Sequence, residues 1–362
     1  MGQIGLCQSG KLRCSQMRTL TGRIIPLVLA AALGCSGGNS GTGPNPGAPA
    51  VPLEDLGMQE YLGMFEGGLY PGGVNTMPGA HNSAGQAHAG NIQPRDISGT
   101  PSPSGKYVLL SIGMSNVTQE WCAVGGNTCN PWTLMGKAAT DPAVNHQTLV
   151  IANGAEGGQV ATDWDDPNDP NYDRVLTNVL TPRGLSEKQV QAVWLKEADR
   201  RPSTGLPSPQ ADAYELETNL GNIVRALRVR YPNLQIVFLS SRIYAGYASS
   251  LLNPEPYAFE SGFAVKWLVE AQITQMQSGT VDPRAGNLDY NTVAPWIAWG
   301  PYLWAAGGTP RSDGLTWVPA DYESDGTHPS TSGETKVANL LLSFFKTDSH
   351  ASCWFLAGSS CP

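Results

Sequence analysis

The chain has 362 residues, of which 41% are hydrophobic and 14% charged, and its formal net charge is −8 at pH 7. Four of its 22 Lys and Arg residues lie in the first 34 positions, so the chain beyond them has 18 bases against 30 acids and a net charge of −12. This acidic balance argues against nucleic acid as a partner.

The N-terminal segment, residues 1–34, has the pattern of a secretory signal peptide. It contains Lys and Arg but no acid, and its apolar run, residues 24–33, is too short to span a bilayer as a folded anchor. The motif Ala32-Leu33-Gly34-Cys35 resembles a bacterial lipobox, in which Cys35 is lipidated after cleavage; cleavage without lipidation is the alternative. We therefore expect an extracytoplasmic protein, either a cell-envelope lipoprotein or a secreted one, that meets the membrane through its lipid anchor only.

A flexible linker follows the leader. Residues 35–55 comprise Cys35 and a stretch rich in Gly, Ser and Pro, which cannot bury enough apolar surface to order. Residues 56–362 are long enough for a single domain with insertions. Within it, residues 61–100 are rich in Gly, Pro, His and Asn and are predicted to form an irregular N-terminal wrap.

From residue 106 onward, strand-like and helix-like runs alternate, as in a doubly wound sheet. Helical spacing of apolar residues predicts helices at about 211–230, 260–276 and 332–345. Strands are expected near residues 107–113, 147–153, 191–195 and 235–240, with a weaker fifth near 294–299. The predicted fold class is therefore α/β, with a mainly parallel sheet between two layers of helices.

Two short motifs carry the candidate chemistry. The first predicted strand ends on Gly113 and presents Ser115 at its carboxyl end, where open α/β sheets build their sites. Near the C-terminus, Asp325 precedes His328 by three residues in a loop with Gly and Pro, so the carboxylate can orient the imidazole while its other nitrogen faces a nucleophile. A helix-capping turn serine and a surface turn capped by Asp325 are the alternative interpretations.

Gly-x-Ser-Asn after the first strand and Asp-x-x-His near the C-terminus resemble the first and last sequence blocks of the SGNH (GDSL-type) hydrolase superfamily, over about residues 105–346. The resemblance implies a three-layer α/β/α, flavodoxin-like fold and a serine esterase that needs no metal or organic cofactor. It assigns Ser115 as the nucleophile, His328 as the base and Asp325 as the residue that orients it. Met114 departs from the family, which usually has a polar residue between the glycine and the serine.

The resemblance also implies an oxyanion hole made of three donors. These are the N–H of Ser115, the N–H of a glycine after the second strand, and an Asn side chain after the third strand. Gly157 matches the glycine, with Gly158 as the alternative register. The third block departs from the family, because Asp199 is the nearest candidate for the Asn, and an ionised carboxylate there would repel the oxyanion. The hole is then left with two backbone donors, with a protonated or rotated Asp199, or with Lys196 as a further donor.

Cysteine spacing predicts two disulfides. The four cysteines beyond Cys35 fall into two close pairs, Cys122 with Cys129 and Cys353 with Cys361, in a chain expected to enter an oxidising compartment. A metal site is the alternative, but the pairs lack the tight Cys-x-x-Cys spacing typical of zinc ligands.

Candidate substrate-binding residues are Asn116, Trp121, Trp164 and Arg242. Tryptophan could stack on a sugar ring or an aromatic acid, although core or rim packing is the simpler role for most of the tryptophans. Arg242, after the fourth strand, could bind an acidic group of the substrate; a structural ion pair is the alternative.

The acidic stretch at 163–173 lacks the glycine and the final acid of an EF-hand, which favours a solvated loop over a calcium site.

These observations predict an extracytoplasmic serine esterase that hydrolyses carboxylic esters through an acyl-enzyme. An acetylated carbohydrate is the first choice of substrate, and a lipid or another carboxylic ester is the second. The alternative is a non-catalytic surface binding lipoprotein on a degenerate SGNH scaffold, which Met114 and the missing third-block Asn favour.

Overall fold

The computed structural model describes residues 50–122 and 128–361. The predicted signal peptide, Cys35 and most of the predicted linker lie outside the described residues. At the end of that linker, helix α1 (Leu53–Leu56) forms and Leu53 is fully buried. The folded part therefore begins a few residues before position 56.

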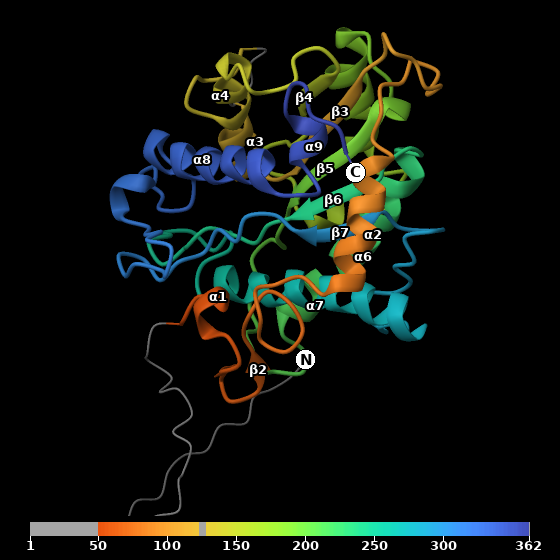
Figure 1. The fold of residues 1–362 in the computed structure, drawn as a ribbon. Coiled ribbons are helices and arrows are strands. Elements are labelled where there is room, and N and C mark those ends of the chain that lie inside the picture. Colours follow the sequence, from red (N-terminus) through yellow and green to blue (C-terminus); the bar gives the residue numbers. More distant parts are fainter. Residues whose placement is uncertain (1–49, 123–127, 362) are drawn as a thin grey trace, which may run out of the picture. The chain divides into compact units, whose positions relative to one another are not determined.

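The centre of the fold is a sheet of five parallel strands in the order β4-β3-β5-β6-β7, which is visible as the run of labelled arrows in Figure 1. Its strands are β3 (Tyr107–Gly113), β4 (Leu149–Asn153), β5 (Val190–Lys196), β6 (Ile236–Leu239) and β7 (Trp296–Trp299). Strands β3, β5, β6 and β7 are buried along their whole length, as expected for parallel strands covered on both faces. All five strands expected from the sequence are confirmed, with ends that differ by no more than two residues.

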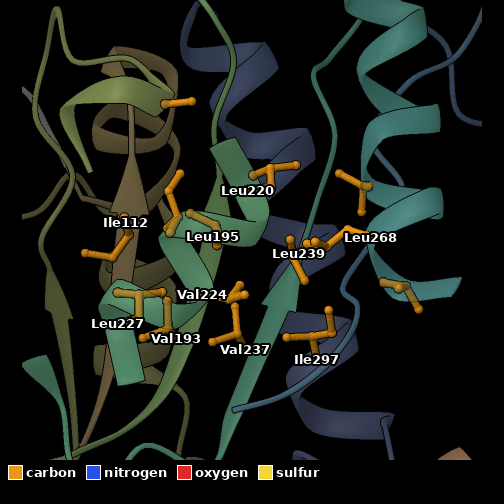
Figure 2. Packing of buried hydrophobic residues seen from close by; sticks show 14 of the residues in the cluster. Ile112, Val193, Leu195, Leu220, Val224, Leu227, Val237, Leu239, Leu268 and Ile297 are labelled. Carbon is orange, nitrogen blue, oxygen red and sulfur yellow. The ribbon is translucent and has the colours of Figure 1, made fainter. Parts of the chain in front are cut away.

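Alternate residues of each strand enter two separate cores, because successive side chains point to opposite faces of a sheet. On β5, Val193 and Leu195 face one core, whereas Ala192 and Trp194 face the other. The first core is covered by α6 (Asp212–Arg230) and α7 (Tyr257–Ser278). Figure 2 shows Leu220, Val224 and Leu227 of α6 lying over the strand residues of this core.

The second core is covered by five helices. They are α2 (Gly79–Gly90), α3 (Ser115–Trp121), α4 (Leu134–Thr140), α8 (Thr331–Thr347) and α9 (Ser352–Phe355). The three predicted long helices correspond to α6, α7 and α8. The chain is thus a three-layer α/β/α fold, as the sequence predicts.

The remaining elements are short and lie in the connections. They are β1 (Glu60–Tyr61), β2 (Phe65–Glu66), α5 (Pro170–Arg174), a π-helical stretch (Val175–Leu180), and 3-10 turns at Ala161–Asp163, Thr181–Arg183, Glu187–Gln189 and Pro319–Asp321. Strands β1 and β2 form a small antiparallel pair within the predicted N-terminal wrap.

None of the helices in the described ranges is both long and apolar enough to cross a membrane.

The strand order places a topological switch point at the end of β3. The chain leaves β3 for the edge strand β4 and then crosses back to β5 on the other side of β3. The connections that leave β3 and β5 therefore diverge at the carboxyl edge of the sheet, which is where open α/β sheets bind their ligands. Ser115 follows β3 at this point.

Candidate active site

Ser115 is positioned by a tight turn between β3 and α3. A Cβ atom on Gly113 would lie 2.3 Å from the backbone oxygen of Lys196 and 2.5 Å from Val117 Cγ2, so only glycine allows β3 to approach β5 this closely. Met114 has an extended backbone, and Ser115 is the first residue of α3. The serine side chain is thereby placed at the carboxyl edge of the sheet.

His328 lies on a loop that is fixed on several sides. Gly326 has a φ of +64°, and a Cβ there would lie 1.9 Å from the backbone oxygen of Tyr247, so this turn also requires glycine. The N–H of Ser249 donates to the backbone oxygen of Asp325 at 2.9 Å, and the amide of Asn116 donates to the backbone oxygen of Thr327 at 3.1 Å. Asn116 therefore connects the helix of Ser115 to the loop of His328, whereas the sequence suggests it as a substrate ligand.

Ser115, His328 and Asp325 form a hydrogen-bonded series. Ser115 Oγ lies 2.9 Å from His328 Nε2, and His328 Nδ1 lies 2.5 Å from Asp325 Oδ2. The other carboxylate oxygen, Asp325 Oδ1, accepts the backbone N–H groups of Thr327 at 2.9 Å and His328 at 3.0 Å. Burial works against ionisation of Asp325, but the hydrogen bonds from His328 and Thr327 outweigh it and lower the pKa of this carboxyl.

This arrangement has a defined chemical consequence. Because a carboxylate can only accept, Nδ1 must carry a proton, and in the neutral ring Nε2 is then free to accept from the serine hydroxyl. That is the arrangement by which an imidazole acts as general base toward a nucleophilic oxygen.

The glycine loop after β4 runs close to Ser115. A Cβ on Gly157 would lie 3.9 Å from Ser115 Cβ. Two arginines hold this loop in place: Arg174 donates to the backbone oxygen of Gly154 at 2.6 Å, and the Arg200 guanidinium donates to the backbone oxygen of Gly158. Within residues 50–122 and 128–361, the N–H groups of Ser115 and Gly157 have no hydrogen-bond acceptor. Both are therefore available to an oxyanion.

Asp199 lies in the wall of the cavity beside Ser115, after β5. Its Oδ1 accepts from Asn219 Nδ2 at 2.9 Å, while Oδ2 is buried without a partner in the described part of the chain. Burial raises the pKa of Asp199 to about 6, and the hydrogen bond from Asn219 only partly opposes this. Lys196, suggested by the sequence as a further oxyanion donor, instead pairs with Glu120 of α3.

The cavity beside Ser115 and His328 has a volume of about 210 Å³. Its wall includes Asp199, Arg242 and Asn253. Three acceptor atoms of its lining residues, Asn116 Oδ1, Asp199 Oδ2 and Asn253 Oδ1, have no partner among the residues that the structure describes. The cavity is therefore small, and its lining residues include unsatisfied acceptors.

Arg242 is 2% exposed and lies in the wall of this cavity. Its Nη1 contacts Met114 Sδ at 2.9 Å, and Nε and Nη2 have no acceptor in the described ranges. The ion pair considered for Arg242 from the sequence is not found in those ranges. Burial lowers the pKa of the guanidinium, and the nearby Glu120 carboxylate opposes this. A buried guanidinium without a counter-ion is costly unless an anion accompanies it.

The two candidate tryptophans do not line the cavity. Trp121 is fully buried, stacks on Trp194 with ring centroids 5.2 Å apart, and donates to the backbone oxygen of Ala152 at 2.9 Å. Trp164 is fully buried against Tyr172. Their expected role in substrate binding is therefore wrong, because burial of their large apolar surface places both in the core.

Both predicted disulfides are present. Cys122 is bonded to Cys129 and Cys353 to Cys361.

The acidic stretch at 163–173 forms capped turns, and no group of three metal-ligating side chains occurs within the described residues. The solvated-loop interpretation of that stretch is consistent with these turns.

Three residues near the site escaped the sequence analysis: Glu120, Asn219 and Asn253. Glu120 is on the helix of Ser115, but its partner Lys196 is 76 positions away in the sequence. Asn219 lies on α6, and the Asn253 amide contacts the backbone oxygen of Asp199 at 3.4 Å. No local motif marks any of the three, because their importance comes only from contacts made by the folded chain.

Comparison with known proteins gives structural neighbours alone. No family model and no curated protein matches the chain. Its structure is similar to an extracellular lipase from Streptomyces rimosus, with 13% identity, a TM-score of 0.33, and coverage of 66% of this chain and 99% of that one. A carbohydrate esterase family 2 enzyme with a carbohydrate-binding domain, from Corynascus thermopiles (Myceliophthora fergusii), has 13% identity, a TM-score of 0.34 and coverage of 67% of each chain. A GDSL-like lipase from Parabacteroides merdae has 13% identity, a TM-score of 0.33, and coverage of 70% of this chain and 97% of that one.

Proposed function

We propose that this protein is a serine esterase that hydrolyses carboxylic esters through an acyl-enzyme. Ser115 Oγ attacks the ester carbonyl as His328 accepts its proton, and His328 then gives that proton to the leaving alcohol. Water, activated by the same imidazole, hydrolyses the acyl-Ser115 bond and releases the acid. The observation that carries the proposal is the hydrogen-bonded series from Ser115 Oγ through His328 to Asp325.

The N–H groups of Ser115 and Gly157 are the proposed oxyanion donors, with Gly158 as the alternative to Gly157. Their support is the short approach of Gly157 to Ser115 and the absence of a competing acceptor in the described ranges. Asp199 is not proposed as a donor in its ionised form, because a carboxylate would repel the charge that develops on the carbonyl oxygen. With two donors in place of three, we expect slower turnover than a complete hole would give.

The proposed substrate is a short-chain ester of a hydroxylated alcohol, with an acetylated carbohydrate as the first choice. A cavity of about 210 Å³ suits a small group, and the free acceptors Asp199 Oδ2 and Asn253 Oδ1 suit hydroxyl donors. A lipid ester is the second choice, and the small volume of the cavity argues against a long acyl chain within it.

Arg242 is proposed to bind an acidic group of the substrate, such as a carboxylate. Its support is the buried guanidinium in the cavity wall, which has no counter-ion in the described part of the chain. A planar guanidinium can donate two parallel hydrogen bonds to a carboxylate.

An extracytoplasmic location remains part of the proposal, together with a lipid anchor at Cys35. Its support from the folded part is the pair of disulfides, which persist in oxidising compartments. Cys35 itself lies outside the described residues.

The alternative, a binding protein without activity, is supported by Asp199, which lines the cavity beside Ser115 and is the residue that the family resemblance aligns with the third oxyanion donor. Hydrolysis of 4-nitrophenyl acetate and butyrate by the full chain and by Ser115→Ala separates the two functions. The esterase proposal expects turnover that Ser115→Ala abolishes. Equal background rates for both proteins would favour the binding protein.

A further inference from the structure

A second cavity lies on the outer side of the layer formed by α6 and α7. Its volume is about 450 Å³, within the usual range for small-molecule sites. Its wall is formed by residues of α6 and α7, by Phe65 of β2 and by the segment 280–284 that follows α7. It shares no wall residue with the cavity beside Ser115.

The unusual feature of this cavity is Glu217 of α6. The residue is 2% exposed, yet its carboxyl group has no hydrogen bond or ion pair within the residues that the structure describes. Two partly or fully buried carboxylates of α7 are different, because Glu270 pairs with Lys266 at 2.6 Å and Glu260 accepts the backbone N–H of Leu206 at 3.0 Å. The oxygens of Glu217 are not among the fully buried unpartnered atoms of the described residues, so they remain accessible from the cavity. Glu217 therefore points into the cavity as an unused acceptor.

The electrostatic setting of Glu217 is acidic. Burial raises the pKa of Glu217 to about 8, Asp282 and Glu270 add to the shift, and Arg284 opposes it. Arg284, the one base among the described residues that line the cavity, lies with its guanidinium 3.9 Å from the ring centroid of Tyr214, which lines the same cavity. An anionic ligand is disfavoured by this wall.

Aromatic residues make up the other side of the cavity. Tyr214 and Trp267 stack on each other with centroids 4.9 Å apart and an interplanar angle of 20°. Arg284 covers the Tyr214 ring, and Phe263 lies 5.6 Å from Trp267 at an angle of 31°. The ring faces are thus engaged by protein neighbours, which disfavours a sugar ring that needs an open face for stacking. The hydrocarbon part of an organic cation can pack beside these rings without an open ring face, and a carboxylate can pair with its charge.

We propose that this second cavity binds an organic ammonium group, with the Glu217 carboxylate as its counter-ion and Tyr214 and Trp267 beside its hydrocarbon part. A metal ion fits less well, because hard cations need several oxygen ligands and no group of three metal-ligating side chains occurs in the described ranges. The proposal is independent of the esterase proposal, since none of the reacting groups belongs to this cavity.

Choline and its neutral isostere 3,3-dimethylbutan-1-ol test the proposal, because they differ mainly in charge. Their binding to the full chain would be measured by ligand-observed NMR titration at about pH 9, where Glu217, with a pKa of about 8, is mostly ionised. We expect choline to bind at least 10-fold more tightly than the alcohol, and Glu217→Gln to weaken choline binding at least 10-fold. Glu215→Gln is the matched control, because Glu215 is an exposed residue of the same helix outside the cavity wall.

Three results would overturn the proposal: no choline binding to the native chain, equal affinity for the alcohol, or equal loss in Glu217→Gln and Glu215→Gln. The comparison of the two ligands uses the native chain, so it remains decisive even if Glu217→Gln does not fold. Binding by a variant lacking Ser115 Oγ, Ser115→Ala, should be unchanged and would separate this site from the esterase site.

Discussion

Lys196 Nζ lies 2.6 Å from both carboxylate oxygens of Glu120, and both side chains are completely buried. Lys196 ends β5, and Glu120 is on α3, the helix that begins with Ser115. The ion pair therefore connects the helix of the proposed nucleophile to the centre of the sheet. Burial lowers the pKa of Lys196 to about 8, and the Glu120 carboxylate opposes this shift.

Removing one partner of this pair should be strongly destabilising, since it leaves the other charge buried without compensation. We predict that Lys196→Met lowers the free energy of unfolding by about 3 to 5 kcal/mol, measured by urea denaturation. Lys346→Met is the control, because Lys346 pairs with Asp141 nearer the surface, and its loss should cost about 1 kcal/mol or less. Similar losses in both variants would show that the buried pair has no special role.

Asp199 should make stability depend on pH. Its pKa rises from 3.8 to about 6 on folding, so its favourable contribution is complete below about pH 4 and is lost as pH rises through 6. Asn at this position can still accept from Asn219 but does not ionise. We predict that Asp199→Asn is about 1 to 3 kcal/mol more stable than the native chain at pH 7, with a difference near zero at pH 4. Urea denaturation at both pH values tests this, and a difference that does not grow with pH would contradict it.

The same substitution tests whether the carboxylate of Asp199 hinders the proposed esterase. If Asp199 lies near the oxyanion of an active esterase, Asp199→Asn should preserve or raise turnover of a small activated ester, because it removes a negative charge. Loss of one oxyanion donor typically lowers turnover by about 10²- to 10³-fold, so a native enzyme with two donors should still be measurable above Ser115→Ala. A large fall in turnover for Asp199→Asn would instead assign the carboxylate a role in catalysis.

Arg242 should determine selectivity for charge. We predict that the native chain prefers 4-acetoxybenzoate over its neutral analogue 4-acetoxybenzamide, and that Arg242→Gln reduces this preference in kcat/KM by about 10- to 100-fold, as expected for a lost charge-assisted hydrogen bond. Arg242→Lys retains the charge and should keep part of the preference. An equal loss for both esters would show that Arg242 does not bind an acidic group.

The sequence predicts the layers of this fold well, because hydrophobic runs and their spacing determine strands and helices locally. The five strands and the helices α6, α7 and α8 were found in this way. Burial of individual large side chains is harder to predict: Trp121 and Trp164 have surroundings that come from distant segments, and both were wrongly expected to bind substrate. The same holds for Lys196, whose partner Glu120 becomes a neighbour only when β5 lies beside β3.

In the candidate site, too, the sequence reveals the residues of short motifs but not the long-range contacts around them. The order of Ser115, Asp325 and His328 along the chain can be found from short motifs at predicted strand ends. The contacts that hold them cannot, since Asn116 reaches Thr327 across more than 200 residues and Asn253 reaches Asp199 from an irregular loop. The sequence does not single out Glu217 either, because a glutamate in a helix is expected to be solvent-exposed, and its burial follows only from the packing of the folded chain.

The central claim is that Ser115 is a nucleophile activated by His328. A fluorophosphonate probe tests it directly, because it reacts covalently only with a serine oxygen that a base has activated. After incubation with the full chain, mass spectrometry of the digested protein should find the adduct on Ser115. The adduct should be absent from Ser115→Ala and greatly reduced in His328→Ala. An unlabelled native chain, or equal labelling of native chain and His328→Ala, would contradict the account.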